Sequence, residues 1–176
     1  MSVYSKSNPI GIDSVIEPLN NLIASTLYDL WSLTDDNSEF YNRVYKIEEG
    51  NGQFKPFGFI TSYKDVLFNS KKYCISFFYV NGNSENSLGL YSSSVVHIVQ
   101  INLDKIYTHI THRADEEIRK DLCQIYDRQP LQVMLNRVSF QPSEVFGDFN
   151  LDVKDYKDMQ PFLNLRFDLT IKYRYK

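Results

Sequence analysis

His109 and His112 form an H-x-x-H pair, the arrangement in this sequence that comes nearest to a metal site. Two imidazoles at this spacing on a helix can bind one zinc ion. The pair precedes the expected helix, however, and no Cys, Asp or Glu stands at a matching ligand spacing. Glycine-rich phosphate loops and G-x-S-x-G elbows are also missing from the sequence. We therefore expect no metal site and no cofactor.

Two further patterns bear on an enzymatic function. His109-Ile110-Thr111 resembles the H-x-T element of two-histidine phosphodiesterases, but that family carries two such elements, and His97 is followed by Ile98-Val99. Asp168 and Lys172 share one expected strand, without the acid-x-lysine step of metal-dependent nucleases. A nuclease or phosphodiesterase would need His97, His109 and Asp168 to converge in one pocket. We expect a protein that is not an enzyme.

The composition is that of a folded, strand-rich chain. Its 176 residues suit one domain, 1–176, and the proportions of 43% hydrophobic and 23% charged residues are ordinary for a globular protein. There are 13 Tyr and 12 Phe against only two Ala, which favours strands over helices. The many Tyr fit either a β-rich core with amphipathic rims or an adhesive surface.

Charge is uneven along the chain, although the formal net charge is only -3. The chain has no basic excess of the kind that a free nucleic-acid binder usually carries. The first half is acidic, whereas the last strand carries Arg166, Lys172 and Arg174 against Asp168. One acidic and one basic region would allow copies of the chain to pair with each other.

Cys74 and Cys123 each lie in an apolar stretch, so we expect buried free thiols rather than a disulfide. The N-terminus does not resemble a signal peptide, and no apolar run reaches the roughly 18 residues of a membrane span. We therefore expect a soluble protein of the cytoplasm, or of an assembly made there, with no membrane partner.

Two segments have helical periodicity. Apolar residues within 12–31 recur at spacings of three and four, which predicts an amphipathic helix that packs on a sheet. Ser14 and Glu17 have capping-box spacing, but Pro18 is unfavourable for that start. A second helix is expected over 113–127, because acidic residues crowd its first turn and a narrow apolar stripe follows.

Strand patterns fill most of the remaining chain. Alternating or continuous apolar residues predict strands over 41–48, 54–60, 71–80, 93–103, 133–140 and 165–175. Pro56 suggests an edge strand or a bulge. We expect residues 1–11 to form an extended arm, and residues 81–92 and 141–163 to form long loops.

The closing strand, 165–175, alternates apolar and largely basic residues to the end of the chain. A long strand of this kind is an aggregation hazard at a sheet edge unless a neighbouring subunit or a partner strand covers it. The order of helix, strands, helix and strands predicts an α+β domain with a mostly antiparallel sheet. The N-terminal amphipathic helix and the second helix are expected to pack on that sheet.

This order of elements, with the segment HRADEEIRKDLCQIY and the ending DMQPFLNLRFDLTIKYRY, resembles the tail-terminator and tail-completion proteins of tailed bacteriophages. The length and the opening MSVYSKSNPI are most similar to the tail-tube terminators of T-even-type contractile phages, which complete the tail and stabilise its sheath. The resemblance covers nearly the whole chain. It implies an α+β fold with a sheet flanked by helices, in a structural virion protein at the head-proximal end of the tail.

The resemblance also implies partners. Six copies would form a homohexameric ring on the tail-tube protein, end tube growth and offer an attachment surface to sheath-terminator or neck proteins. The tape-measure protein is a further candidate partner, and DNA would pass only as cargo. The alternative is an intracellular adaptor, a binding module that recognises a peptide or a partner strand at a sheet edge.

Physical reasoning, rather than the resemblance, selects residues for a subunit or partner interface. Long connections that lack structure of their own are usually functional, and exposed basic residues suit contacts with an acidic surface. The expected interface residues lie on the basic face of the closing strand and in three loops, and they are Arg166, Lys172, Arg174, Asn51, Lys55, Asn83, Phe146, Phe149 and Tyr156.

Overall fold

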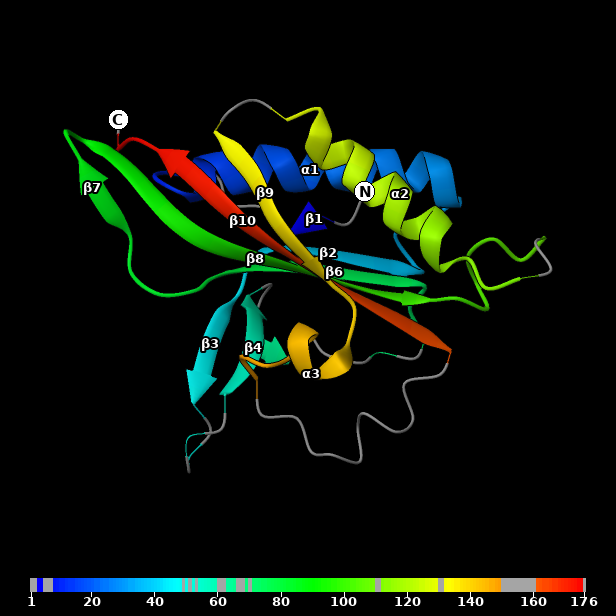
Figure 1. Ribbon diagram of the computed structural model, residues 1–176. Helices are drawn as coiled ribbons and strands as arrows, with labels where there is room; N and C mark the ends of the chain where they lie inside the picture. Colours follow the sequence, from blue (N-terminus) through cyan, green and yellow to red (C-terminus); the bar gives the residue numbers. More distant parts are fainter. Residues whose placement is uncertain are drawn as a thin grey trace.

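A computed structural model of the chain describes residues 3–4, 8–48, 50, 52, 54–59, 63–65, 69, 71–109, 112–129, 132–149 and 161–175. In chain order its elements are β1 (Val3–Tyr4), α1 (Asp13–Trp31), β2 (Ser38–Arg43), β3 (Tyr45–Glu48), β4 (Phe54–Phe59), β5 (Tyr63–Asp65), β6 (Cys74–Val80), β7 (Glu85–Ser87), β8 (Leu90–Asn102), α2 (Asp115–Asp127), β9 (Val133–Ser139), α3 (Pro142–Val145) and β10 (Phe162–Tyr173). Figure 1 shows α1 and α2 on one side of the main sheet, with α3 and the small sheet on the other. The predicted α+β class is confirmed.

The main sheet is mixed and mostly antiparallel. Its strand order is β1-β2-β6-β8-β10-β9, and β7 pairs with one end of β8. The β1/β2 and β2/β6 pairs are parallel, and the other pairs are antiparallel. The closing strand β10 lies between β8 and β9, so the chain itself pairs both of its edges and removes the hazard that an edge position would have created.

The predicted N-terminal helix is confirmed as α1, but its capping box does not form. Ile12 is the N-cap without a side-chain hydrogen bond, and Ser14 Oγ donates instead to the Gly11 carbonyl at 2.6 Å. The helix continues through Pro18, which lacks the N–H that an interior position would use. The start of α1 is instead held by a tertiary contact, an ion pair between Asp13 in its first turn and Arg43 on β2 at 2.6 Å.

The helix face of the sheet holds the larger hydrophobic core. Alternate residues of β10, among them Leu165, Phe167 and Leu169, are almost fully buried there. α1 contributes a stripe that includes Ile23 and Leu27, and α2 contributes its own narrow stripe. The period of two along β10 and the period of three to four along α1 meet in this core, which is why both patterns were readable in the sequence.

The opposite face holds a second core. Phe77 and Tyr79 of β6 pack with Val96 of β8, and the segment 142–149 covers them with Phe146 and Phe149. The Phe149 ring meets the Tyr79 ring edge to face, with 5.0 Å between centroids. Strands β3, β4 and β5 form the separate small sheet on this side. Both faces of β6 and β8 are therefore buried, as the continuous apolar runs of those strands require.

Several sequence expectations need correction. Residues 81–92 were expected to form a loop, but β7 and the start of β8 form a hairpin there. Within the expected loop over 141–163, residues 142–145 form α3, a helix too short to show periodicity, and β10 already begins at Phe162; residues 150–160 lie outside the described part of the chain. Pro56 lies on β4, the middle strand of the small sheet, rather than on an edge strand. At Pro56 itself β4 pairs with Lys46 of β3, and the pairing of β4 with β5 begins at Phe57. Within 1–11, residues 3–4 pair with β2 as β1.

Candidate assembly surfaces

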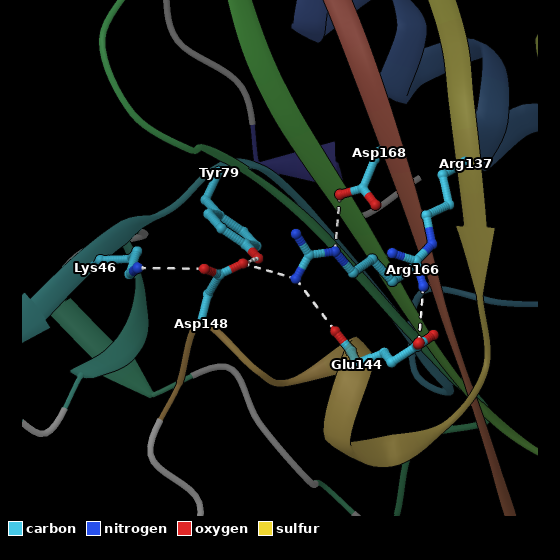
Figure 2. Close-up of polar contacts among 7 residues, drawn as sticks. All are labelled: Lys46, Tyr79, Arg137, Glu144, Asp148, Arg166 and Asp168. Atoms are coloured by element: carbon cyan, nitrogen blue, oxygen red, sulfur yellow. Dashed lines mark hydrogen bonds and ion pairs between the residues drawn. The ribbon is translucent and has the colours of Figure 1, made fainter.

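The α3 side of the main sheet carries a polar network centred on Arg166 (Figure 2). Its guanidinium donates to Asp168 on the same strand at 2.8 Å and to Asp148 at 2.7 Å. It also donates to the backbone carbonyl of Glu144 at 3.2 Å, and the Glu144 carboxylate pairs with Arg137 on β9. The Arg166 side chain is only 13% exposed, so its charge is neutralised within the protomer.

Asp148 connects this network to two other elements. The Tyr79 hydroxyl on β6 donates to Asp148 Oδ2 at 2.7 Å, and Lys46 Nζ on β3 lies 3.9 Å from Asp148 Oδ1. Burial alone would raise the pKa of the Asp148 carboxyl, but the Tyr79 hydrogen bond and the Arg166 guanidinium outweigh it, so that pKa lies below its ordinary value. The network therefore fastens the segment after α3 and the small sheet to the main sheet.

A groove of about 1040 Å³ lies at the end of the molecule where α1 begins and β10 ends. Apolar surface from Ile10, Val15, Leu90 and Tyr173 lines it, together with the basic Lys172 and Arg174. Ile10 is 71% exposed although it is aliphatic. This end of the molecule therefore combines accessible apolar surface with positive charge, as partner-binding surfaces do.

The outer edge of β9 is a second accessible feature. β9 is the last strand of the main sheet, and within the described residues no strand pairs with its outer side. Its pairing with β10 is interrupted near Asn136 by a bulge between Asp168 and Leu169. Met134, on the same strand, is 46% exposed. An unpaired edge offers backbone N–H and C=O groups to an added strand, although a bulge limits how far that strand can extend.

The residues selected from the sequence for an interface do not form one surface. Lys172 and Arg174 meet at the groove, whereas Arg166 is occupied in the network on the α3 side. Phe146 and Phe149 are 0% and 2% exposed and belong to the second core. Lys55 is half-buried on β4, Asn83 is exposed before β7, and Asn51 and Tyr156 lie outside the described residues.

His97, His109 and Asp168 do not converge. His97 lies on β8 in the core under α2, where Nε2 contacts Ser76 Oγ at 2.6 Å and Nδ1 contacts the Tyr126 hydroxyl at 2.5 Å. Asp168 lies on the other face of the sheet with Arg166, and His109 lies in the turn region after β8. Burial lowers the pKa of His97 to about 3, so the ring is neutral in the folded chain at physiological pH.

Other site chemistry was sought in the described part of the chain. No group of three or more His, Cys, Asp or Glu side chains is placed there to hold a metal ion. Neither α1 nor α2 has the length and apolar character together that crossing a bilayer requires. Both cysteines are free thiols; Cys74 is buried as expected, whereas Cys123 is only half-buried.

Sequence reasoning missed the partners that give Arg166 its role. Asp148 comes from a segment that carries no strong periodic pattern, so nothing in its spacing pairs it with a residue on the closing strand. It also missed the hairpin over residues 85–92, although Gly89 was a usable turn signal. β7 is short and polar, and the alternation that reveals buried strands is absent from it.

Comparison of the sequence with descriptions of protein families gives no match. Comparison with curated proteins gives no significant similarity either. Function therefore has to be inferred from the residues of this chain and from their arrangement.

Proposed function

We propose that the protein is a structural component of a phage virion that caps the tail tube as a ring. It would end tube growth and form the attachment surface for the sheath terminator or the neck. The observation that supports this most is the agreement between the fold implied by the resemblance and the fold observed. In both, an N-terminal amphipathic helix and a second helix flank a mostly antiparallel sheet.

The distribution of accessible surface also supports assembly. Both faces of the central strands are covered by the chain's own elements, so contacts with other subunits have to use other surfaces, among them edges, ends and turns. The groove beside Lys172 and the outer edge of β9 are surfaces of this kind. A ring that closes through heterologous contacts needs two different patches on each protomer, and these surfaces could supply them.

A cap has to match one surface and present another. The end of a growing tube exposes the surface that each added ring would cover. A terminator binds that surface and offers a different one, so growth stops and a new partner can bind. This requires subunits that associate with one another and with the tube protein, and the head-proximal end of the tail is where we place the protein.

Electron microscopy of particles from a host that produces the phage with this gene interrupted tests the proposal. Tails of abnormal length, or tails that lose their sheath or fail to join heads, are the expected result. The defect should be reversed when the intact chain is supplied from a plasmid. Normal infectious particles would overturn the proposal.

A second candidate function is favoured by the outer edge of β9. An adaptor that binds an extended peptide by strand addition would use such an edge, with pockets for alternate side chains setting specificity. This function predicts a stable monomer and a ligand whose backbone amides become protected from hydrogen exchange on binding. A chain that binds no extended peptide but associates with tail tubes would exclude it.

A further inference from the structure

Leu88 occupies an unfavourable position in two respects. It is 99% exposed at the tip of the β7–β8 hairpin, which Figure 1 shows projecting beyond the start of α1. It also has a φ of 52°, in the left-handed region, and Gly89 follows with a φ of 77°. Two-residue hairpin turns with positive φ at both positions favour Asn-Gly or Gly-Gly, because a larger L side chain at the first position is strained.

Folding of the chain does not account for a leucine at this site. An asparagine would suit the backbone, and nothing in the fold buries the Leu88 side chain. Single exposed leucines are common on protein surfaces, but one that is also held in a strained backbone conformation suggests a contact outside the protomer. The turn has a local hydrogen bond of its own, in which the Gly89 amide donates to Asn86 Oδ1 at 3.0 Å.

The groove at the same end of the molecule complements the hairpin tip. Its apolar wall includes Ile10 and Val15, and its basic side chains are Lys172 and Arg174. Within the described residues neither basic side chain forms an ion pair. The hairpin supplies an exposed aliphatic tip at Leu88 and an exposed carboxylate at Glu85. The two features match in both hydrophobicity and charge.

We propose that Leu88 of one copy inserts into the groove of a second copy, between Ile10 and Val15, with Glu85 facing Lys172 and Arg174. The contact deepens the proposed function and rests on it, because it names the surface through which copies of a ring-forming protein join. Hairpin tip and groove lie at the same end of each protomer. Two copies that meet end to end can therefore exchange both contacts, and the measured stoichiometry separates that arrangement from a ring.

The first test compares the self-association of the purified full chain with that of Leu88→Asn by sedimentation equilibrium. Asparagine fits the positive φ, so we expect the thermal transition of Leu88→Asn to stay the same or rise. Self-association should weaken by about tenfold or more, because the inserted apolar side chain is lost. Leu22→Gln is the matched control, since Leu22 is an exposed leucine on α1 outside the hairpin and the groove; this variant should associate like the unmodified chain.

The second test exchanges charges. Glu85→Lys and Lys172→Glu should each weaken association, and the double variant Glu85→Lys, Lys172→Glu should recover most of the loss because the pair is restored with opposite polarity. A purified chain that stays monomeric up to about 1 mM would overturn the proposal. Association that is unchanged in Leu88→Asn, or a double variant no tighter than its single variants, would overturn it as well.

Failure of this contact and failure of the proposed function are distinguishable. The association experiments use the purified chain alone, whereas the proposed function is tested on phage particles. Abnormal tails without the gene, together with normal tails in a Leu88→Asn phage, would support the terminator and remove this contact. Normal particles without the gene would remove the terminator and leave the association measurement to decide on the contact by itself.

Discussion

Arg166 on β10 and Asp148, 18 residues earlier in the chain, form an ion pair in which Nη1 and Oδ2 lie 2.7 Å apart. The pair joins β10, the last strand of the chain, to the segment that covers the second core. In the sequence Arg166 belongs with Arg174 to one basic face. The structure separates them, because Arg166 is 13% exposed and Arg174 is exposed at the groove.

Replacement of Arg166 should therefore affect folding. Arg166→Glu would bring a third carboxylate against Asp148 and Asp168, and we expect the free energy of unfolding to fall by about 2–4 kcal/mol. Urea titration followed by circular dichroism measures the change. Arg174→Glu is the control, and as an exposed substitution it should change stability by no more than about 0.5 kcal/mol. Equal effects of the two variants would contradict the role of Arg166 in the network.

The buried His97 predicts a loss of stability toward acid. Burial lowers its pKa from 6.5 to about 3, so between these pH values the unfolded chain binds a proton that the folded chain does not. The free energy of unfolding should therefore fall as pH decreases from 6.5, with a slope approaching about 1.4 kcal/mol per pH unit. Urea midpoints between about pH 6.5 and 5 isolate this effect from most of the carboxylates.

His97→Gln tests this assignment, and His112→Gln is its control. Loss of the buried imidazole in His97→Gln should flatten the slope between about pH 6.5 and 5, although the variant will be less stable overall because Ser76 and Tyr126 lose their partner. His112 is an exposed residue that pairs with Glu117, and its replacement leaves His97 in place. A slope that persists in His97→Gln would show that another group binds the proton.

Gly11 packs so closely against Tyr175 that a larger residue at position 11 should destabilise the fold. A Cβ at Gly11 would lie 2.5 Å from Tyr175 Cε1, and Gly11 has a φ of +60°. Gly11→Ala should lower the free energy of unfolding by about 1–2 kcal/mol, from backbone strain and from displacement of the Tyr175 ring. Gly82→Ala is the control, because Gly82 also has a positive φ but a Cβ added there would have no atom within 4 Å. Chemical denaturation of both variants, and of each combined with Tyr175→Ala, separates strain from the steric contact.

Asp121 on α2 links two segments through one carboxylate oxygen. Trp31 Nε1 at the end of α1 donates to Asp121 Oδ2 at 2.9 Å, and the Tyr107 hydroxyl donates to the same atom. Asp121→Ala should cost about 1–3 kcal/mol, because both donors lose their acceptor. Asp121→Asn keeps one oxygen and should cost less. Trp31 is the only tryptophan in the chain, so its fluorescence reports the change directly; an unaltered emission spectrum in Asp121→Ala would argue against this contact.

Long periodic patterns made much of the fold predictable from the sequence. The spacing of Ile16, Ile23 and Leu27 marked α1, and the alternation of Leu165, Phe167 and Leu169 marked β10, because each residue in such a series is buried for the same reason. The α+β class followed from the order of these elements. Short or polar elements, such as β7 and α3, repeat too few times to produce a readable pattern.

The roles of individual side chains were decided only by tertiary structure. Alternation placed Arg166 on the face of β10 opposite the helices. Only the fold brings Asp148 and Tyr79 next to it, so that Arg166 forms an ion pair within the protomer instead of contacting a partner. His97 is an ionisable residue within an apolar stretch of sequence, and burial under α2 lowers its pKa so that the ring stays neutral. The physical reason is common to both. Periodicity depends on near neighbours in the chain, whereas charge and burial depend on segments that only folding brings together.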